Sequence, residues 1–166
     1  MAAETLTAAR AAASFPVFKG VGSGLVSAAY GSYAIAANVE DGDIFEMCKV
    51  PAGAVVIGGN IYAPDIDTNA TETLDMDLGW AANGGSGTYD AADPDGLGNL
   101  GVWTGDAFAN PSISPVAGNI IPFSGLLATG VLPSFTKETV IQLEANAAAA
   151  TFAAGTVSVV VYYVCP

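Results

Sequence analysis

The stretch Leu74-Asp75-Met76-Asp77-Leu78-Gly79-Trp80 indicates the fold class of this chain. Apolar residues occupy every second position, and polar or small residues stand between them. Successive side chains of a β-strand point to opposite faces, so this pattern predicts a strand with one buried and one solvated face. In a helix, the same apolar residues would be scattered around the axis.

Strand-like segments lie on both sides of this stretch. Turn signals such as Asp41-Gly42 and Pro51-Ala52-Gly53 separate several of them, at intervals near 8–12 residues. This spacing predicts an all-β sandwich or barrel. The last segment, 156–165, is apolar on both faces, which is typical of a strand that lies centrally in a sandwich or is covered by a neighbouring subunit. The other predicted strands are 26–37, 44–50, 54–63, 120–127 and 138–145.

We predict a single β-sandwich domain over residues 25–166 and an N-terminal arm before it over residues 1–24. Alanine favours a helix over residues 2–13, and Pro16 would end it. The arm is either a frayed terminus or a segment that becomes ordered on a partner. Residues 81–118 are rich in Gly, Asp, Asn and Pro and are predicted to form a long loop, with short strands at most.

Composition limits the classes of partner. Of the 166 residues, 52% are hydrophobic and only 12% are charged, against a usual share of about 25%. Sixteen acidic and four basic residues give a net charge of −12. The four bases are far apart in the sequence, whereas binding to nucleic acid needs clustered Lys or Arg. We therefore expect neither nucleic acid nor an anionic membrane surface as a partner.

The sequence contains no long apolar run and no recognisable leader. Its longest apolar run, 159–165, is far shorter than a bilayer-spanning helix requires. Glu4 and Arg10 interrupt the N-terminal region where a signal peptide needs an apolar block. We therefore expect synthesis in a reducing cytoplasm, and two buried free thiols at Cys48 and Cys165 are favoured over a disulfide.

Catalytic motifs are missing from the sequence. It contains no histidine, which excludes Ser–His and Cys–His pairs and His-bearing zinc sites. Asp75 and Asp77 would lie about 6.6–7 Å apart on one strand face, a separation that a glycosidase could use, but a solvated polar face is the simpler interpretation. We predict that the protein is not an enzyme and needs no cofactor.

Calcium binding is a weaker alternative. Asp65, Asp67 and Asn69 match the first ligands of an EF-hand loop, but Ala70 and Met76 stand where that loop needs glycine and a bidentate glutamate. The segment 90–95, DAADPD, could also gather carboxylates around a cation. Aspartate is common in turns, so no metal site is predicted.

Several segments together resemble a known family. Residues 42–56, GDIFEMCKVPAGAVV, are followed by Asp65–Asn69, by the strand Thr73–Gly79, and by a closing hairpin over Glu138–Val164. This order is similar to that of head decoration, or cement, proteins of tailed bacteriophages, and it covers about two thirds of the chain. The resemblance implies a jelly-roll-like β-sandwich, a homotrimer, and a place on the outer capsid surface of the virion, bound to the major capsid protein.

The resemblance supplies no site residues, so contact residues are predicted from the arm alone. Phe15, Pro16, Phe18 and Lys19 combine apolar anchors with a base outside the sandwich pattern, and we expect them to reach a neighbouring subunit. Two alternatives stay open. One is a receptor- or glycan-binding module that uses loop 81–118 with Trp103, and the other is a shell-forming capsid subunit.

Overall fold

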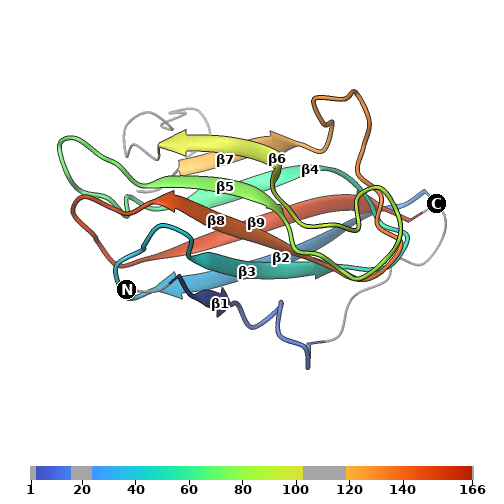
Figure 1. The fold of residues 1–166 in the computed structure, drawn as a ribbon, viewed down its shortest axis with the longest axis horizontal. Coiled ribbons are helices and arrows are strands. Elements are labelled where there is room, and N and C mark those ends of the chain that lie inside the picture. The colour runs from blue at the N-terminus through green and yellow to red at the C-terminus, as the bar shows by residue number, and fades with distance from the viewer. Residues whose placement is uncertain (1–2, 16–23, 103–118, 166) are drawn as a thin grey trace.

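The computed structural model describes residues 3–15, 24–102 and 119–165. These ranges contain nine strands and no helix (Figure 1), so none of the described residues forms a helix that could cross a membrane. The strands are β1 (Thr5–Thr7), β2 (Val26–Ile35), β3 (Ile44–Val50), β4 (Val55–Ala63), β5 (Asp75–Trp80), β6 (Asp93–Val102), β7 (Asn119–Ser124), β8 (Thr139–Ala147) and β9 (Gly155–Val164).

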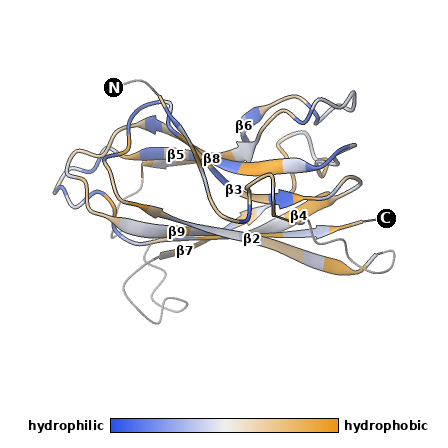
Figure 2. Cartoon of the chain, turned by 90° about the horizontal axis from the view of Figure 1, so that it is seen from below, coloured by the Kyte–Doolittle hydropathy of each residue, from blue (hydrophilic) through white to orange (hydrophobic). Residues whose placement is uncertain are grey.

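The strands form two sheets that pack face to face (Figure 2). Sheet A has the order β1-β3-β8-β5-β6, and sheet B has the order β2-β9-β4-β7. The pairing of β1 with β3 is parallel, and every other pairing is antiparallel. From β2 to β9 the chain changes sheet at each connection except the one between β5 and β6. Eight strands connected in this way form a jelly-roll-like sandwich, which confirms the predicted fold class.

The core lies between the sheets and is built by alternation along the strands. On β9, the residues at 157, 159, 161 and 163 are buried, whereas those between them are more exposed. On β3, the register against β8 shifts between Glu46 and Cys48, and both Met47 and Cys48 are buried there. The largest fully buried side chains include Trp80, Tyr163, Phe45, Phe135 and Met47.

The two sheets come very close where β2 passes β3. A Cβ added to Gly31 on β2 would lie 1.8 Å from the carbonyl oxygen of Met47. Only glycine permits this approach of two backbones without a shift of one strand. The apolar, Gly-punctuated sequence of β2 therefore serves to close one side of the sandwich.

The predicted N-terminal helix is wrong. Residues 5–7 form strand β1, and residues 8–15 form turns against the sandwich. The amide of Ile44 donates to the carbonyl of Glu4, and that of Ala8 donates to the carbonyl of Glu46, at 2.7 Å each. Ala8 and Ala11 are buried in this segment. Pairing with the free edge of β3 and burial of small alanines outweigh helix propensity, which contributes only tenths of a kcal/mol per residue.

The segment 81–118 contains a ten-residue strand, β6, which is longer than the short strands that the sequence suggested. Its residues, DPDGLGNLGV, have low strand propensity because of their glycines, aspartates and proline. β6 lies at the edge of sheet A beside β5, where proline and glycine are tolerated. Residues 103–118 lie outside the described residues.

Both cysteines are free thiols. Cys48 is buried, as predicted, and its burial raises the pKa of the thiol to about 12. Cys165 is only half-buried, because it follows the last strand at the end of the sandwich.

Candidate interaction surface

Sheet B carries no charged side chain. None of the residues of β2, β4, β7 and β9 is Asp, Glu, Lys or Arg, although the chain has 20 such residues. Every described charged group therefore lies on sheet A or in a loop. A sheet in a soluble protein commonly has one solvated polar face, so an outer face without charge is unusual.

The outward side chains of sheet B form what we call the uncharged face. Paired residues point to the same side, so the register places Tyr30 with Val160 and Tyr62 with Ser158 on this face. Tyr30 is 48% exposed, and Tyr62 and Tyr162 are each 37% exposed. The uncharged face comprises Val26, Ala28, Tyr30, Ser32, Ala34, Asn60, Tyr62, Ile120, Pro122, Ser124, Thr156, Ser158, Val160 and Tyr162.

Polar groups on the uncharged face bond to one another. The hydroxyls of Ser32 and Ser158 lie 2.7 Å apart across β2 and β9. The amide nitrogen of Asn60 donates to the hydroxyl of Tyr162 over 3.2 Å. These bonds pair four of the polar side chains of the face with one another, so covering these four costs less in lost hydration than covering unpaired groups would.

A shallow pocket interrupts the uncharged face at β4, β7 and β9. Its volume is about 300 Å³, and its lining residues are Asn60, Tyr62, Ile120, Ser158 and Val160. All of these residues except Ile120 lie on β4 or β9, at positions that alternate along the strand with buried core residues. Such a hollow can receive one protruding side chain of a partner, in the way that anchor residues fill pockets in protein interfaces.

One cation lies at the β2 side of this face. The guanidinium of Arg10 lies 3.6 Å from the ring centre of Tyr30 and donates a hydrogen bond to its hydroxyl. It also lies 5.0 Å from the ring centre of Phe15. The structure thus places the predicted contact residue Phe15, half-buried, against its own chain. Pro16, Phe18 and Lys19, like Trp103, lie outside the described residues.

The outer side of sheet A is acidic by contrast. Asp77 of β5 pairs across the strands with Glu144 of β8, and Asp75, Asp93 and Asp95 lie on β5 and β6. Burial raises the pKa of Asp77, and the charges of Asp75 and Asp95 add to this, although Asn146 donates to its carboxylate. Burial, followed by neighbouring acids, also raises the pKa values of Asp93 and Glu144. The two faces of the sandwich therefore differ sharply in charge.

Replacing Asp77 with Asn is expected to stabilise the protein by about 1 kcal/mol at neutral pH, since it removes one of several like charges from adjacent strands. The pKa of Asp77 is raised in the folded state, so its charge costs stability above that pKa, and the cost disappears as pH falls. The gain in urea-unfolding free energy should therefore vanish in acid. Equal stability of the two proteins at neutral pH would contradict this explanation.

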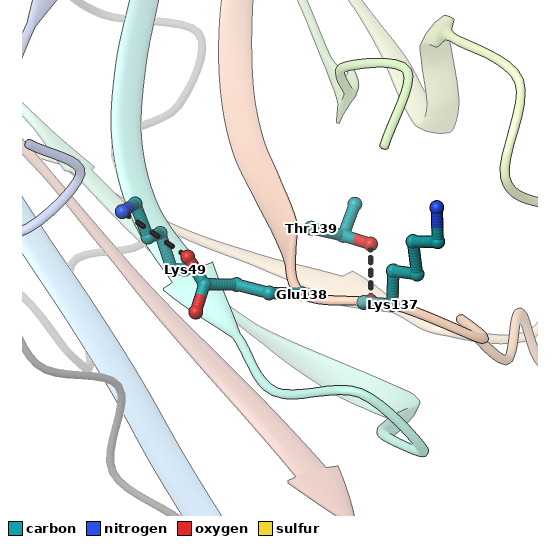
Figure 3. Close-up of polar contacts among 4 residues, drawn as sticks. All are labelled: Lys49, Lys137, Glu138 and Thr139. Atoms are coloured by element: carbon teal, nitrogen blue, oxygen red, sulfur yellow. Dashed lines mark hydrogen bonds and ion pairs between the residues drawn. The ribbon is translucent and has the colours of Figure 1, made fainter. Parts of the chain in front are cut away.

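The other described bases also have partners within the chain. Lys49 on β3 forms an ion pair with Glu138, with Nζ and Oε1 3.2 Å apart (Figure 3). Lys137 extends away from that pair in Figure 3, and its ammonium donates to the carbonyl of Gly84 over 2.6 Å. The Thr139 hydroxyl donates to the carbonyl of Lys137 over 3.0 Å and so fixes the start of β8. These bases join loops and strands to one another.

Asp67 and Asp90, two of the aspartates that could serve as calcium ligands by sequence, instead accept hydrogen bonds that fix the conformation of loops. Asp67 is 1% exposed and accepts hydrogen bonds from five backbone amides. Asp90 is also buried, and its carboxylate accepts hydrogen bonds from the Thr136 hydroxyl and amide, from Asn83 and from Gly87; led by that hydroxyl, these bonds lower the pKa of Asp90 despite burial. Among the described residues there is no group of three or more metal-binding side chains that could hold an ion.

Comparisons with known proteins bear on the fold. No family model matches the sequence, and no curated protein matches it significantly. A chain in the capsid of Ralstonia phage GP4 has a similar fold, with a TM-score of 0.72 and 20% identity over 98% of each chain. A chain in the capsid asymmetric unit of cyanophage Pam1 has a TM-score of 0.58 and 26% identity over 93% of this chain and 95% of that chain. These similarities support a structural role in a phage head.

Proposed function

We propose that this chain is a decoration protein that binds the outer surface of a phage head as a homotrimer and stabilises the shell. The observation that carries the proposal is the uncharged face on a strongly acidic jelly-roll sandwich whose fold matches chains of two phage capsids. Large exposed apolar patches on soluble proteins mark sites of protein contact, and this face exposes large hydrophobic side chains at Val26, Tyr30, Tyr62 and Tyr162. The role requires no catalytic group.

The charge distribution fits a position outside the shell. DNA packed in a head is a dense polyanion, and a chain of net charge −12 is repelled by it. On the outside, the acidic side of sheet A can face solvent or basic loops of the major capsid protein. Many copies on one shell add avidity, because each bound copy ties together neighbouring capsid subunits.

Binding to shells tests the proposal directly. We expect the purified protein to bind saturably to heads that lack it, to appear on their outer surface by cryo-electron microscopy, and to raise the temperature at which they break. A variant with Phe15, Pro16, Phe18 and Lys19 all replaced by Ala tests the predicted role of the arm, and we expect weaker binding. Normal binding of this variant would remove the arm from the proposal.

Two results would contradict the decoration role. Assembly of the pure protein into closed shells would identify it as a shell-forming subunit. Failure to bind any shell, together with sugar affinity that is lost when Trp103 is replaced, would identify a glycan-binding module.

A further inference from the structure

A groove lies at the edge of sheet A, between β6 and the loop that follows β7. β6 and β7 are the edge strands of their sheets and lie next to each other on one side of the sandwich (Figure 1). We call this hollow the edge groove. Its volume is about 470 Å³, and it is lined by residues 93 and 95–99 of β6, by residues 126–129 and by Tyr89. A cavity of this size can hold one long side chain or a small ligand.

Both walls of the edge groove are held in place within the chain. The loop is closed by hydrogen bonds from the amide of Leu127 to the carbonyl of Val131, over 3.0 Å, and from the amide of Gly130 to the carbonyl of Leu127, over 2.8 Å. The other wall is strand β6, whose Gly96 lies against the ring of Trp80. A site with ordered walls loses little conformational entropy when it binds a ligand.

The edge groove combines apolar walls with two carboxylates. Leu97 is buried at one wall, and Leu126 is 58% exposed at the other. Asp93 is half-buried, Asp95 is exposed, and both line the groove. Burial, followed by a hydrogen bond and repulsion between the two acids, raises the pKa of Asp93. The two carboxylates therefore lie close together, and a cation bound to both would relieve their repulsion.

No base of the described chain neutralises these acids, since Arg10, Lys49 and Lys137 all bind partners elsewhere. On β5, beside the groove, one carboxylate oxygen of Asp75 and one of Asp77 are buried without a hydrogen-bond partner. Asp77 is only 6% exposed, and the charge of Asp95 acts to raise its pKa. Buried polar atoms without partners are rare and costly in folded proteins. A cation in the edge groove would therefore also lower the negative potential at β5.

From these observations we infer that the edge groove binds an arginine side chain of another protein. The aliphatic stem of the arginine lies along Leu97 and Leu126, and its guanidinium bonds to Asp93 and Asp95. A metal ion fits less well, because the described residues include no group of three metal-binding side chains and leucines offer no ligands. Lysine also fits less well, because its compact ammonium lacks the planar fork with which arginine bonds two acceptors at once.

The inference rests on the proposed function only for the identity of the partner, which is then a subunit of the shell. The uncharged face supplies contact area without charge, whereas complementary charges give specificity and fix orientation. An arginine in the edge groove thus determines how the chain is oriented on the shell. The groove itself is tested on the isolated protein, so the arginine site and the decoration role can fail separately.

Amide chemical shifts of the isotope-labelled protein measure binding to the groove. The probe is Nα-acetyl-arginine amide, and its matched control is Nα-acetyl-citrulline amide, which has nearly the same shape and no charge. We expect saturable shifts at residues 93–99 and 126–129 with the arginine probe, and binding at least about tenfold weaker with citrulline. Added salt should weaken the arginine binding. Absence of shifts at these residues would overturn the inference, and so would equal shifts from calcium chloride, which would identify a metal site.

A double variant tests the two carboxylates. Asp93→Asn with Asp95→Asn keeps the side-chain shapes and removes both charges, so its affinity for the arginine probe should fall by at least about tenfold. The matched control is Glu4→Gln with Asp41→Asn, which removes the same charge from two exposed residues and should bind the probe normally. Circular dichroism verifies that both variants are folded. Equal affinities of the two variants would contradict the arginine site.

The same two variants test whether the partner is a subunit of the shell. We expect the variant without Asp93 and Asp95 carboxylates to bind phage heads at least about tenfold more weakly than the control variant. Equal binding to heads would overturn the shell subunit as the source of the arginine. If the wild-type protein binds the probe but no head, the decoration role fails and the arginine site stands. If it binds heads but not the probe, the arginine site fails and the decoration role stands.

Discussion

Replacing Asp67 with Asn is expected to destabilise the folded protein by about 3 kcal/mol or more, although the two side chains have nearly the same shape. Both carboxylate oxygens accept backbone amides. Oδ2 accepts from Thr73 at 2.8 Å and Ala150 at 2.9 Å, and Oδ1 accepts from Thr151 at 2.8 Å. An asparagine has one acceptor oxygen, so its NH₂ group would face amides that lose their partner.

These bonds join two loops that are far apart in the sequence. Asp67 lies in the connection between β4 and β5, and residues 150 and 151 lie in the connection between β8 and β9. The amide of Leu74 also donates to Oδ2, over 3.2 Å. Loss of the carboxylate would therefore release one whole end of the sandwich. Urea unfolding monitored by circular dichroism measures the effect.

The effect should depend on pH in a defined direction. Burial acts to raise the pKa of Asp67, but backbone amides led by that of Thr73 outweigh it and lower the pKa from 3.8 to about 2. The stabilisation is therefore complete above pH 4 and is lost as pH falls toward 2. Wild-type and Asp67→Asn proteins should converge there. Asp41→Asn removes the same charge from an exposed turn and should change stability little at any pH.

The clearest sequence pattern predicted its strand well, and weaker patterns failed for physical reasons. The alternation at 74–80 correctly places Leu78 and Trp80 in the core, but the face predicted to be solvated is largely buried, because neighbouring strands and loops cover it and leave Asp77 only 6% exposed. β6 has no comparable pattern, because an edge strand buries few side chains and Leu97 is the one buried residue on it. The position of β6 is set by its pairing with β5, and the local sequence of β6 does not reveal that pairing.

The candidate interaction surface could be found only in part from the sequence. The sequence shows directly that no charged residue occurs in the segments 26–35, 55–63 and 155–164. The sequence does not show that these segments lie side by side, since the jelly-roll order brings β2 against β9 and β9 against β4. The last strand was predicted to be central or covered by a subunit. It is central in sheet B, yet its outer side remains partly exposed.

Replacing Trp80 with Ala is expected to cost about 3–5 kcal/mol, the usual range for removing a large aromatic side chain from a core. Trp80 is 1% exposed. Its ring lies edge-on to Phe135, with ring centres 5.3 Å apart, and near Tyr89 at 6.2 Å. The indole nitrogen donates to the carbonyl of Ala91 over 2.9 Å. One side chain thus holds β5, the connection that leads to β6, and the segment before β8.

Removal of the Trp80 ring should destabilise strand β6 more than any other strand. A Cβ on Gly96 would lie 2.4 Å from the Trp80 ring, so the ring and the β6 backbone are in close contact. Without the ring, this edge strand loses its main apolar support, and its amides should exchange with solvent faster than those of β9. Trp80→Phe keeps an aromatic ring and gives up the bond to Ala91, so it should cost far less than Trp80→Ala. Equal costs for the two variants, or uniform exchange over both sheets, would show that the indole does not anchor β6.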